Sequence, residues 1–273
     1  MVDTMDRIYT MAFVVLLSVG LLSSLDIQNP SFNLSASVTS RTPTISADYP
    51  ALSIEVNIPA AELRLKENGE IVRRFNVAVG QPQYPTPIRS EQLTQLIWNP
   101  WWFPPDSPWA KDEKVTPPGP GNPLGPVKMP LSDGVRMHGT TKDKSIGTAA
   151  SHACIRMHNE DARTLAWILQ SEYSDAIDPA LLEKYRRHSG SSFYVTLARP
   201  IPVDFIYEPV EIEGEVLKLH RDWYHKIKNP KATLLEALKQ SGMASDAVNE
   251  ETLNALVKDW QNHSIEIPLS VTP

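Results

Sequence analysis

The chain of 273 residues contains a single cysteine, Cys154, and three histidines lie near it in the sequence: His138, His152 and His158. A cysteine becomes a nucleophile when a base removes its proton, and attack on a carbonyl also needs hydrogen-bond donors for the oxyanion that forms. The separation between His138 and Cys154 lets two neighbouring strands, or their ends, bring the imidazole to the thiol. These residue types therefore predict thiolate chemistry as one use of this segment.

Gly139 follows His138 directly, and its backbone carbonyl is a candidate partner for one imidazole nitrogen. Such a bond would fix the tautomer that presents the other nitrogen to the sulfur. The backbone N–H groups of His152, Ala153 and Cys154 are candidates for an oxyanion hole. If Cys154 is catalytic, we expect a lowered pKa for its thiol, because the thiolate is the reactive form.

Two other interpretations of the same residues remain open at this point. His138, His152, Cys154 and His158 together offer three nitrogens and one sulfur, a set that tetrahedral zinc accepts. No paired Cys-x-x-Cys or His-Glu-x-x-His motif supports zinc, however. Alternatively, Cys154 is an inert buried residue among surface histidines.

Length and composition indicate one large domain, or one domain with an appendage, and enough apolar residues for a core. The formal net charge of −6 and the absence of a basic run argue against a nucleic-acid-binding protein. A single cysteine also excludes an intramolecular disulfide framework.

The N-terminal segment predicts export. Residues 8–25, IYTMAFVVLLSVGLLSSL, carry no charge and are long enough for a signal sequence or nearly for a membrane span. Residues 1–25 are therefore predicted to be a signal peptide or an N-terminal membrane anchor. Residues 26–50 are rich in Ser, Thr, Asn and Pro, without apolar periodicity, and are predicted to be a linker.

The folded part begins with β-strand patterns. Apolar and polar residues alternate over 52–58, and two strand-like runs flank Asn68-Gly69, a strong hairpin signal. From Pro100 to Pro130 the density of proline excludes a helix and an interior strand. Tryptophans in and next to this segment indicate an ordered loop packed on the sheet and a candidate wall for a cleft.

Helices are predicted after the cysteine. Asn159 is a candidate cap for a helix whose face carries Ala162, Leu165, Ala166 and Leu169. A second helix has Asp178 as its cap and Pro179 in its first turn. A strand over 192–198 then returns to the sheet and closes the domain near Arg199.

The tail from Pro200 has a different pattern. It predicts two strands joined at Glu213-Gly214 and two helices, Pro230–Ser241 and Asn249–His263. The second helix carries Leu253, Leu256, Val257 and Trp260 at helical spacing, which favours a core-packing appendage over a cofactor site.

The complete string SHACIRMHNEDA, from Ser151 to Ala162, with HGT upstream, resembles the catalytic signature of the L,D-transpeptidases (YkuD-like domain). The usual form is His-Gly-Thr, then Ser-His-Gly-Cys-Ile-Arg-Met, then Asn and Asp. The resemblance spans 52–198 and includes VAVG (77–80), NPLGP (122–126) and SIG (145–147). It implies a mostly β fold: a YkuD-like β-sandwich catalytic domain over 51–199, with a long Pro/Trp-rich loop and few helices. A small α+β C-terminal extension over 200–273, of unknown role, would follow.

The resemblance also implies roles for the residues of the motif. Cys154 would be the nucleophile, His138 the base and Gly139 the residue whose carbonyl orients that base, while His152 would lie beside the oxyanion hole. Arg156 would contact polar groups of the substrate. Ser151 and Ala153 fall at substrate-side positions, although capping or packing is equally compatible with Ser151 and Asn159. His158 falls at a variable position and is expected on the surface.

The implied activity is that of a peptidoglycan L,D-transpeptidase without a metal or organic cofactor. The thiolate would attack the diaminopimelate carbonyl of a stem tetrapeptide, release D-alanine and pass the acyl group to an amine. The acceptor could be a second stem peptide or a lysine of an envelope lipoprotein, and the location would be extracytoplasmic or periplasmic. Lys142 and Lys144 are further candidates for contact with the acidic stem.

Two alternatives stay open on the same scaffold: a cell-wall hydrolase or L,D-carboxypeptidase, and a non-catalytic peptidoglycan-binding protein. The sequence departs from the motif at Ala153, where the family has glycine. If this position needs a positive φ, alanine costs about 1 kcal/mol. A second departure, TPIR (86–89) in place of Thr-Pro-Thr-Gly, changes a local turn. Removal of residues 230–273 is expected to impair activity more than folding.

Overall fold

The computed structural model describes residues 51–240, 250–260 and 263–268. The predicted signal peptide or anchor (1–25) and the predicted linker (26–50) lie outside these ranges. The described residues belong to one compact unit, Ala47–Pro273. Among them, no helix combines the length and the apolar character that crossing a membrane requires.

Three strands at the start of the described chain form an antiparallel meander: β1 (Leu52–Asn57), β2 (Glu62–Glu67) and β3 (Glu70–Gly80). Asn68 and Gly69, between β2 and β3, have φ angles of 52° and 90°. Positive φ at both central residues is what a type I′ turn requires, and Asn-Gly tolerates it best. The predicted hairpin is confirmed.

The fold is mostly β, as predicted, and is built on a nine-stranded sheet in the order β2-β1-β9-β4-β5-β6-β8-β3-β7. The remaining strands of this sheet are β4 (Ser90–Trp98), β5 (Val127–Pro130), β6 (Arg136–His138), β7 (Ala149–Ser151), β8 (Ile155–Met157) and β9 (Phe193–Ile206). β3 pairs with β2 along its first part and with β8 near its end, so the pairings close on themselves around the apolar core.

Two helices cover this core: α1 (Asn159–Tyr173) and α2 (Pro179–Arg187). The predicted apolar face of α1 is fully buried, and Asp178 caps α2 through a bond from the Ala180 N–H, as predicted. Asn159 is not the cap of α1, however. His158 occupies that position, and Asn159 is the first helical residue, which frees its side chain for another contact.

The Pro/Trp-rich loop is ordered, as predicted, by hydrogen bonds along its length. Trp102 and Thr116 form an isolated antiparallel bridge. The buried side-chain amide of Asn122 donates to the carbonyls of Pro100, Thr116 and Pro117 at 2.8, 3.1 and 3.0 Å. One amide group thus connects the two ends of the loop.

The expectation that the Pro100–Pro130 segment contains no interior strand is wrong for β5. Lys128 and Met129 carry ladder pairing to β6, and Val127 pairs with β4. The prolines do not prevent this, because Pro126 precedes the strand and Pro130 ends it, where a missing N–H is tolerated.

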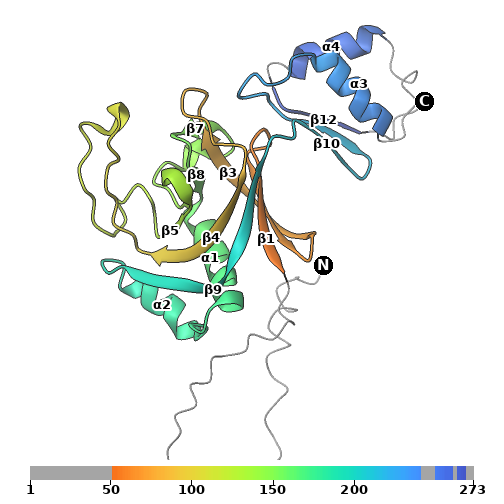
Figure 1. The fold of residues 1–273 in the computed structure, drawn as a ribbon. Helices are drawn as coiled ribbons and strands as arrows, with labels where there is room; N and C mark the ends of the chain where they lie inside the picture. The colour runs from red at the N-terminus through yellow and green to blue at the C-terminus, as the bar shows by residue number, and fades with distance from the viewer. Residues whose placement is uncertain (1–50, 241–249, 261–262, 269–273) are drawn as a thin grey trace, which may run out of the picture. The chain divides into compact units, whose positions relative to one another are not determined.

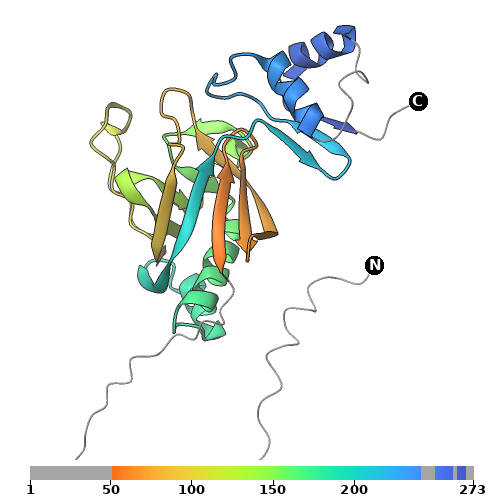
Figure 2. The same ribbon diagram turned by 45° about the vertical axis from the view of Figure 1, so that its right-hand side comes forward.

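Strand β9 is longer than the sequence pattern predicts and runs past Arg199 to Ile206. It pairs antiparallel with β4 and, beyond Arg199, parallel with β1. The strand lies beside β4 and β1 in both views of the ribbon (Figures 1 and 2). Ile201, Val203 and Phe205 belong to the main core, so the sheet is completed only at Ile206.

The rest of the tail forms a small α+β extension with its own core. Its elements are β10 (Val210–Glu213), β11 (Val216–Leu219), α3 (Pro230–Gln240), α4 (Glu250–Trp260) and β12 (Ile265–Pro268). The predicted hairpin at Glu213-Gly214 and both predicted helices are present, while β12 was not predicted. Leu253 and Trp260 of α4 are buried against β11 and α3 in a second apolar cluster.

Candidate active site

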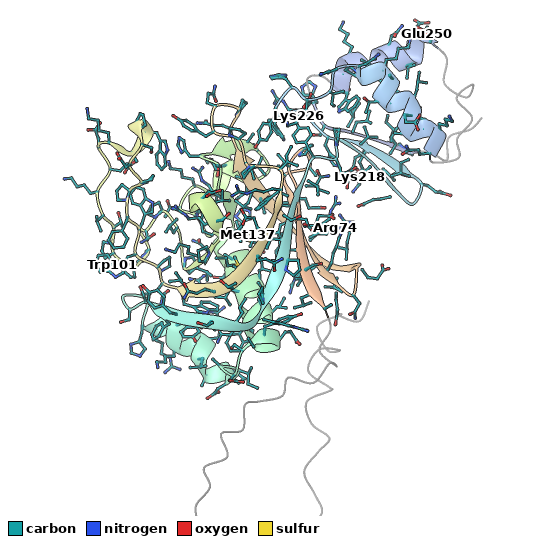
Figure 3. All side chains as sticks on the ribbon, in the orientation of Figure 1. Arg74, Trp101, Met137, Lys218, Lys226 and Glu250 are labelled. Carbon is teal, nitrogen blue, oxygen red and sulfur yellow. The ribbon has the colours of Figure 1, made fainter. Side chains whose placement is uncertain are left out.

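The parallel strands β6 and β8 place the chemically important side chains on one face of the sheet. His138 pairs with Arg156 across the two strands. Since side chains alternate along a strand, Arg136, two residues earlier on β6, shares this face. Cys154 directly precedes β8 and lines the same cavity. Met137, between Arg136 and His138, is fully buried in the core instead (Figure 3).

These four residues line a cavity of about 520 Å³. Other predicted site residues in its lining are Ser151, His152 and Ala153. The Pro/Trp-rich loop supplies one wall of the cavity through Trp102, Trp109, Glu113 and Leu124. The sequence-based expectation that this loop walls a cleft is confirmed.

His138 is nearly inaccessible, and its Nδ1 lies 2.5 Å from the carbonyl oxygen of Gly139, the predicted hydrogen bond. Burial lowers the pKa of His138 to about 3, and the charges of Arg136 and Arg156 act in the same direction, while the bond to Gly139 opposes it. The imidazole is therefore neutral at neutral pH. With its Nδ1 proton donated to the carbonyl, its Nε2 is left as a proton acceptor.

Asn159 holds Gly139 in place. Its Oδ1 accepts the Thr140 N–H at 2.9 Å. A Cβ atom on Gly139 would lie 2.4 Å from this oxygen, a distance that real side chains do not adopt. Glycine is thus required at 139 by close approach, and Asn159 has a positioning role within the site.

The turn before β8 presents Cys154 and is fixed by two side chains. Ser151 Oγ donates to the Cys154 carbonyl at 2.5 Å, and Thr86 Oγ1 donates to the Ala153 carbonyl at 3.0 Å. Ala153 itself has a φ of 70°, a left-handed conformation that glycine would adopt without strain. The motif departure at Ala153 therefore carries the steric cost considered above, and the turn is held despite it.

The pKa of the Cys154 thiol is raised by burial, although the charges of Arg136 and Arg156 and a backbone hydrogen bond from Arg136 oppose this. The expectation of a lowered thiol pKa is thus wrong, because removal from water outweighs the cationic neighbours. Consistent with a protonated sulfur, Sγ lies 3.9 Å from the Gly134 carbonyl oxygen. A neutral thiol and a neutral imidazole therefore line the same cavity.

His152 contacts two aromatic rings. Trp109 stacks on it with centroids 4.0 Å apart and planes 4° apart, and Tyr84 meets it edge-on at 4.8 Å. Burial lowers the pKa of His152, and the charges of Arg156 and Lys142 add to this effect. Tyr84 was not predicted from the sequence, because its contact with His152 exists only once β3 and β7 are paired.

The cavity is lined by cationic and acidic groups. Arg136, Arg156 and Lys142 line it, as do Glu113 and Asp133. Arg136 was missed by the sequence reasoning, although its position two residues before His138 on a strand is a usable signal.

The zinc interpretation finds no support in the described part of the chain, which contains no group of three His, Cys, Asp or Glu residues able to hold a metal ion. His158 is exposed, as expected, and its Nδ1 lies 3.2 Å from Asp143 Oδ1. The structure also disfavours the inert-cysteine interpretation, because Cys154 lines a cavity together with the buried His138.

Residues 52–190 match the YkuD family, the L,D-transpeptidase catalytic domain. The match covers half of the chain, and the chain belongs to this family.

Similar proteins carry the same family name. The YkuD protein of Bacillus licheniformis is 33% identical over 127 residues, which cover 46% of this chain and 65% of that protein. The YbiS protein of Escherichia coli K12 is 29% identical over 119 residues, 40% of this chain and 39% of its own length. Both are named as L,D-transpeptidases, and this chain spans less than two thirds of each.

The solved structures that this chain matches include L,D-transpeptidase 3 from Mycobacterium tuberculosis. The sequence identity is 16% and the TM-score is 0.38, and the match covers 57% of this chain and 61% of that chain. The catalytic domain of the E. faecium L,D-transpeptidase has 15% identity and a TM-score of 0.38, with 57% and 96% covered.

Ala153→Gly is expected to raise the free energy of unfolding by up to about 1 kcal/mol, because glycine removes the left-handed strain at this turn. Urea unfolding measures it. The matched control is Ala150→Gly in β7, where the backbone is not left-handed; this variant should lose stability. Equal losses in both variants would contradict the argument.

The buried neutral state of His138 predicts acid lability. Its pKa in the folded protein, about 3, lies below the unfolded value, so the unfolded chain binds more protons and stability falls as the pH falls through roughly 6.5 towards 3. We expect this residue alone to remove about 2–3 kcal/mol between pH 7 and pH 4.5. Urea unfolding at both pH values should show a smaller difference in His138→Gln, whereas the surface variant His158→Gln should keep the parent's difference.

The raised thiol pKa predicts that alkylation of Cys154 by iodoacetamide still accelerates above the ordinary cysteine pKa of about 8.5. Mass spectrometry of the modified chain gives the rate at each pH. Arg136→Gln should shift the profile further towards alkaline pH, because it removes a charge that favours the thiolate. A plateau already reached at neutral pH would indicate a preformed thiolate and overturn this expectation.

Proposed function

We propose that this protein is a peptidoglycan L,D-transpeptidase in which Cys154 is the nucleophile and His138 the general base. The observation that carries the proposal is the buried neutral imidazole, bonded through Nδ1 to Gly139, in the cavity that Cys154 also lines. This is the orientation that a base needs in order to accept the thiol proton at Nε2. Membership of the L,D-transpeptidase family supports the reaction class.

The proposed reaction begins from the neutral pair. Sγ attacks the diaminopimelate carbonyl of a stem tetrapeptide while its proton moves to His138 Nε2. Charge develops only during attack, when Arg136 and Arg156 stabilise the sulfur. Backbone N–H groups of His152, Ala153 and Cys154 are the proposed donors to the oxyanion.

The intermediate then collapses as His138 returns its proton to the leaving D-alanine amine, which breaks the peptide bond and leaves a thioester on Cys154. An acceptor amine enters and gives a proton to His138 as its nitrogen attacks the thioester. The new amide forms, and the thiol recovers its proton. Side chains and backbone groups suffice for each of these steps.

The charges of the cavity suit a stem peptide. Diaminopimelate carries a carboxylate and an amine beyond the reacting carbonyl. Arg156 acts on the thiol with positive charge, and Lys142 adds a further cation to the cavity lining. Glu113 and Asp133, also in the lining, carry the negative charge that suits an amine. Ser151 acts here through the Cys154 backbone rather than on the substrate.

The proposed location is extracytoplasmic, where peptidoglycan lies, with residues 8–25 as the export signal or anchor. The acceptor is proposed to be the amine of a second stem peptide; a lysine of an envelope protein is the alternative amine. Hydrolysis to a tripeptide remains the alternative activity on this scaffold, because water and an amine attack the same thioester.

The test is incubation of the purified chain with disaccharide-tetrapeptide, followed by mass spectrometry of the products. We expect a dimer with loss of D-alanine. Cys154→Ala should reduce product to background, and His138→Gln should slow the reaction by about 10²–10⁴-fold, the usual contribution of a general base. Thermal unfolding of each variant controls for folding.

The products separate the alternatives. Tripeptide without dimer would replace transpeptidation by carboxypeptidase activity. Equal product from the parent and Cys154→Ala would exclude Cys154 as the nucleophile. Binding of the stem without turnover by a folded chain would favour a non-catalytic peptidoglycan-binding protein.

A further inference from the structure

We propose that Tyr224, in the C-terminal extension, is a positioning residue for the cysteine-bearing turn. The inference deepens the proposed function, because it assigns to the extension a role in the same site. The family match ends at residue 190, so Tyr224 lies outside it. The link runs from the Tyr224 hydroxyl through the segment 80–86 to the carbonyl next to Cys154.

The Tyr224 hydroxyl holds both ends of a short loop. It donates to the Gly80 carbonyl at 2.7 Å and accepts the Thr86 N–H at 3.0 Å. Between these points the chain folds back so tightly that a Cβ on Gly80 would lie 2.3 Å from the Tyr84 carbonyl oxygen. Burial raises the pKa of Tyr224, so the hydroxyl keeps the proton that it donates.

The same loop is bonded to the turn that presents Cys154. Thr86 Oγ1 accepts the Gly80 N–H at 2.9 Å and donates to the Ala153 carbonyl at 3.0 Å. The Gln81 N–H donates to the Ser151 carbonyl at 2.9 Å. Two hydrogen bonds thus connect the loop to the residues on either side of His152.

The bond to Ala153 fixes a particular peptide group. In a trans peptide the C=O and the following N–H point in opposite directions. Holding the Ala153 carbonyl on Thr86 therefore also sets the direction of the Cys154 N–H, a proposed oxyanion donor. Because Ala153 is in the strained left-handed conformation, this turn depends on such external bonds more than a turn with glycine would.

The loop reaches the site by a second route through Tyr84. Its ring contacts His152 edge-on, and Trp109 stacks on the same imidazole. Displacement of the segment 80–86 would therefore move an aromatic wall of His152 as well as the Ala153 carbonyl.

Tyr224 is itself held by its neighbours in the extension. Its N–H donates to the Tyr207 hydroxyl at 2.9 Å, and that hydroxyl donates in turn to Asp222. Asp222 also accepts the N–H groups of Lys226 and Ile227 at 2.9 and 2.8 Å. The segment is thus a preorganised support rather than a loose tail.

The extension has other attachments to the sheet that do not involve this hydroxyl. Trp223 Nε1 donates to the Pro59 carbonyl at 3.1 Å. Arg74 of β3, labelled in Figure 3, pairs with Glu213, and Glu211 pairs with Arg64 at 2.6 Å. Removing the Tyr224 hydroxyl therefore tests the link to the site without detaching the extension.

The experiment compares Tyr224→Phe with Trp223→Phe in the full chain. Each variant loses one side-chain polar group at the same junction, but only Tyr224 is bonded to the 80–86 loop. For Tyr224→Phe we expect kcat for dimer formation to fall about tenfold, since two buried backbone groups lose their partner and the turn loosens. The kcat of Trp223→Phe should stay within about twofold of the parent's kcat, while its Tm falls by about as much as that of Tyr224→Phe.

A double-mutant cycle tests the route through Thr86. Thr86→Val removes the hydroxyl that binds Ala153 and should lower kcat as Tyr224→Phe does, whereas Thr86→Ser should fall less. If both residues act along one chain of bonds, the double variant should lose clearly less than the product of the two single effects. Full multiplication of the two effects would overturn the proposed route.

Alkylation of Cys154 by iodoacetamide separates this inference from the proposed function, because it needs no stem peptide. Relative to Trp223→Phe, Tyr224→Phe should change the alkylation rate constant at least about threefold at one or more pH values. An unchanged profile together with equal kcat losses in both variants would overturn the positioning role. A changed profile in a protein without transpeptidase activity would retain the role and reject only the proposed function.

Discussion

The parallel register of β6 and β8 is the constraint on which the site depends. It sets His138 opposite Arg156, and Cys154, directly before β8, lines the same cavity. Strands this short cannot hold a register alone, and here β5 and β3 flank them within the closed sheet. A shift of one residue would turn His138 into the core and Met137 into the cavity, so the full burial of Met137 also secures the position of the histidine.

Burial and charge act against each other at this site, and burial prevails. Three cations influence the pKa of His138, one from each of three adjacent strands: Lys128, Arg136 and Arg156. They disfavour protonation of the imidazole, and Arg136 and Arg156 favour the thiolate, yet desolvation still raises the thiol pKa. The outcome is a resting state without internal charge separation. In the proposed reaction, the cations stabilise sulfur charge during attack, which is where stabilisation increases a rate.

Local signals in the sequence were sufficient to predict several features of the fold and the site. Asn68-Gly69 predicts its own hairpin, and the bond between His138 and Gly139 joins neighbouring residues. The features that were missed depend on distant segments. β5 forms by pairing with β4 on one side and β6 on the other. Asn159 is the first helical residue and accepts the Thr140 N–H instead of capping α1. Tyr84 contacts His152 only when the strands that carry them are folded. The thiol pKa was missed for the same reason, since the motif shows charge but not burial.

In the proposed arrangement, the site depends on residues beyond the boundary of the family match. β9 continues the sheet past the matched region to Ile206. Further along the chain, the Tyr224 hydroxyl donates a hydrogen bond to the Gly80 carbonyl. A glycine before the cysteine would adopt a positive φ without strain, whereas Ala153 holds the same conformation at a cost. Hydrogen bonds from Thr86 and Ser151 offset that cost locally, and Tyr224 supports Thr86. Ala153 strains the turn that carries Cys154. In this proposal the extension, outside the family match, supports that turn through Thr86.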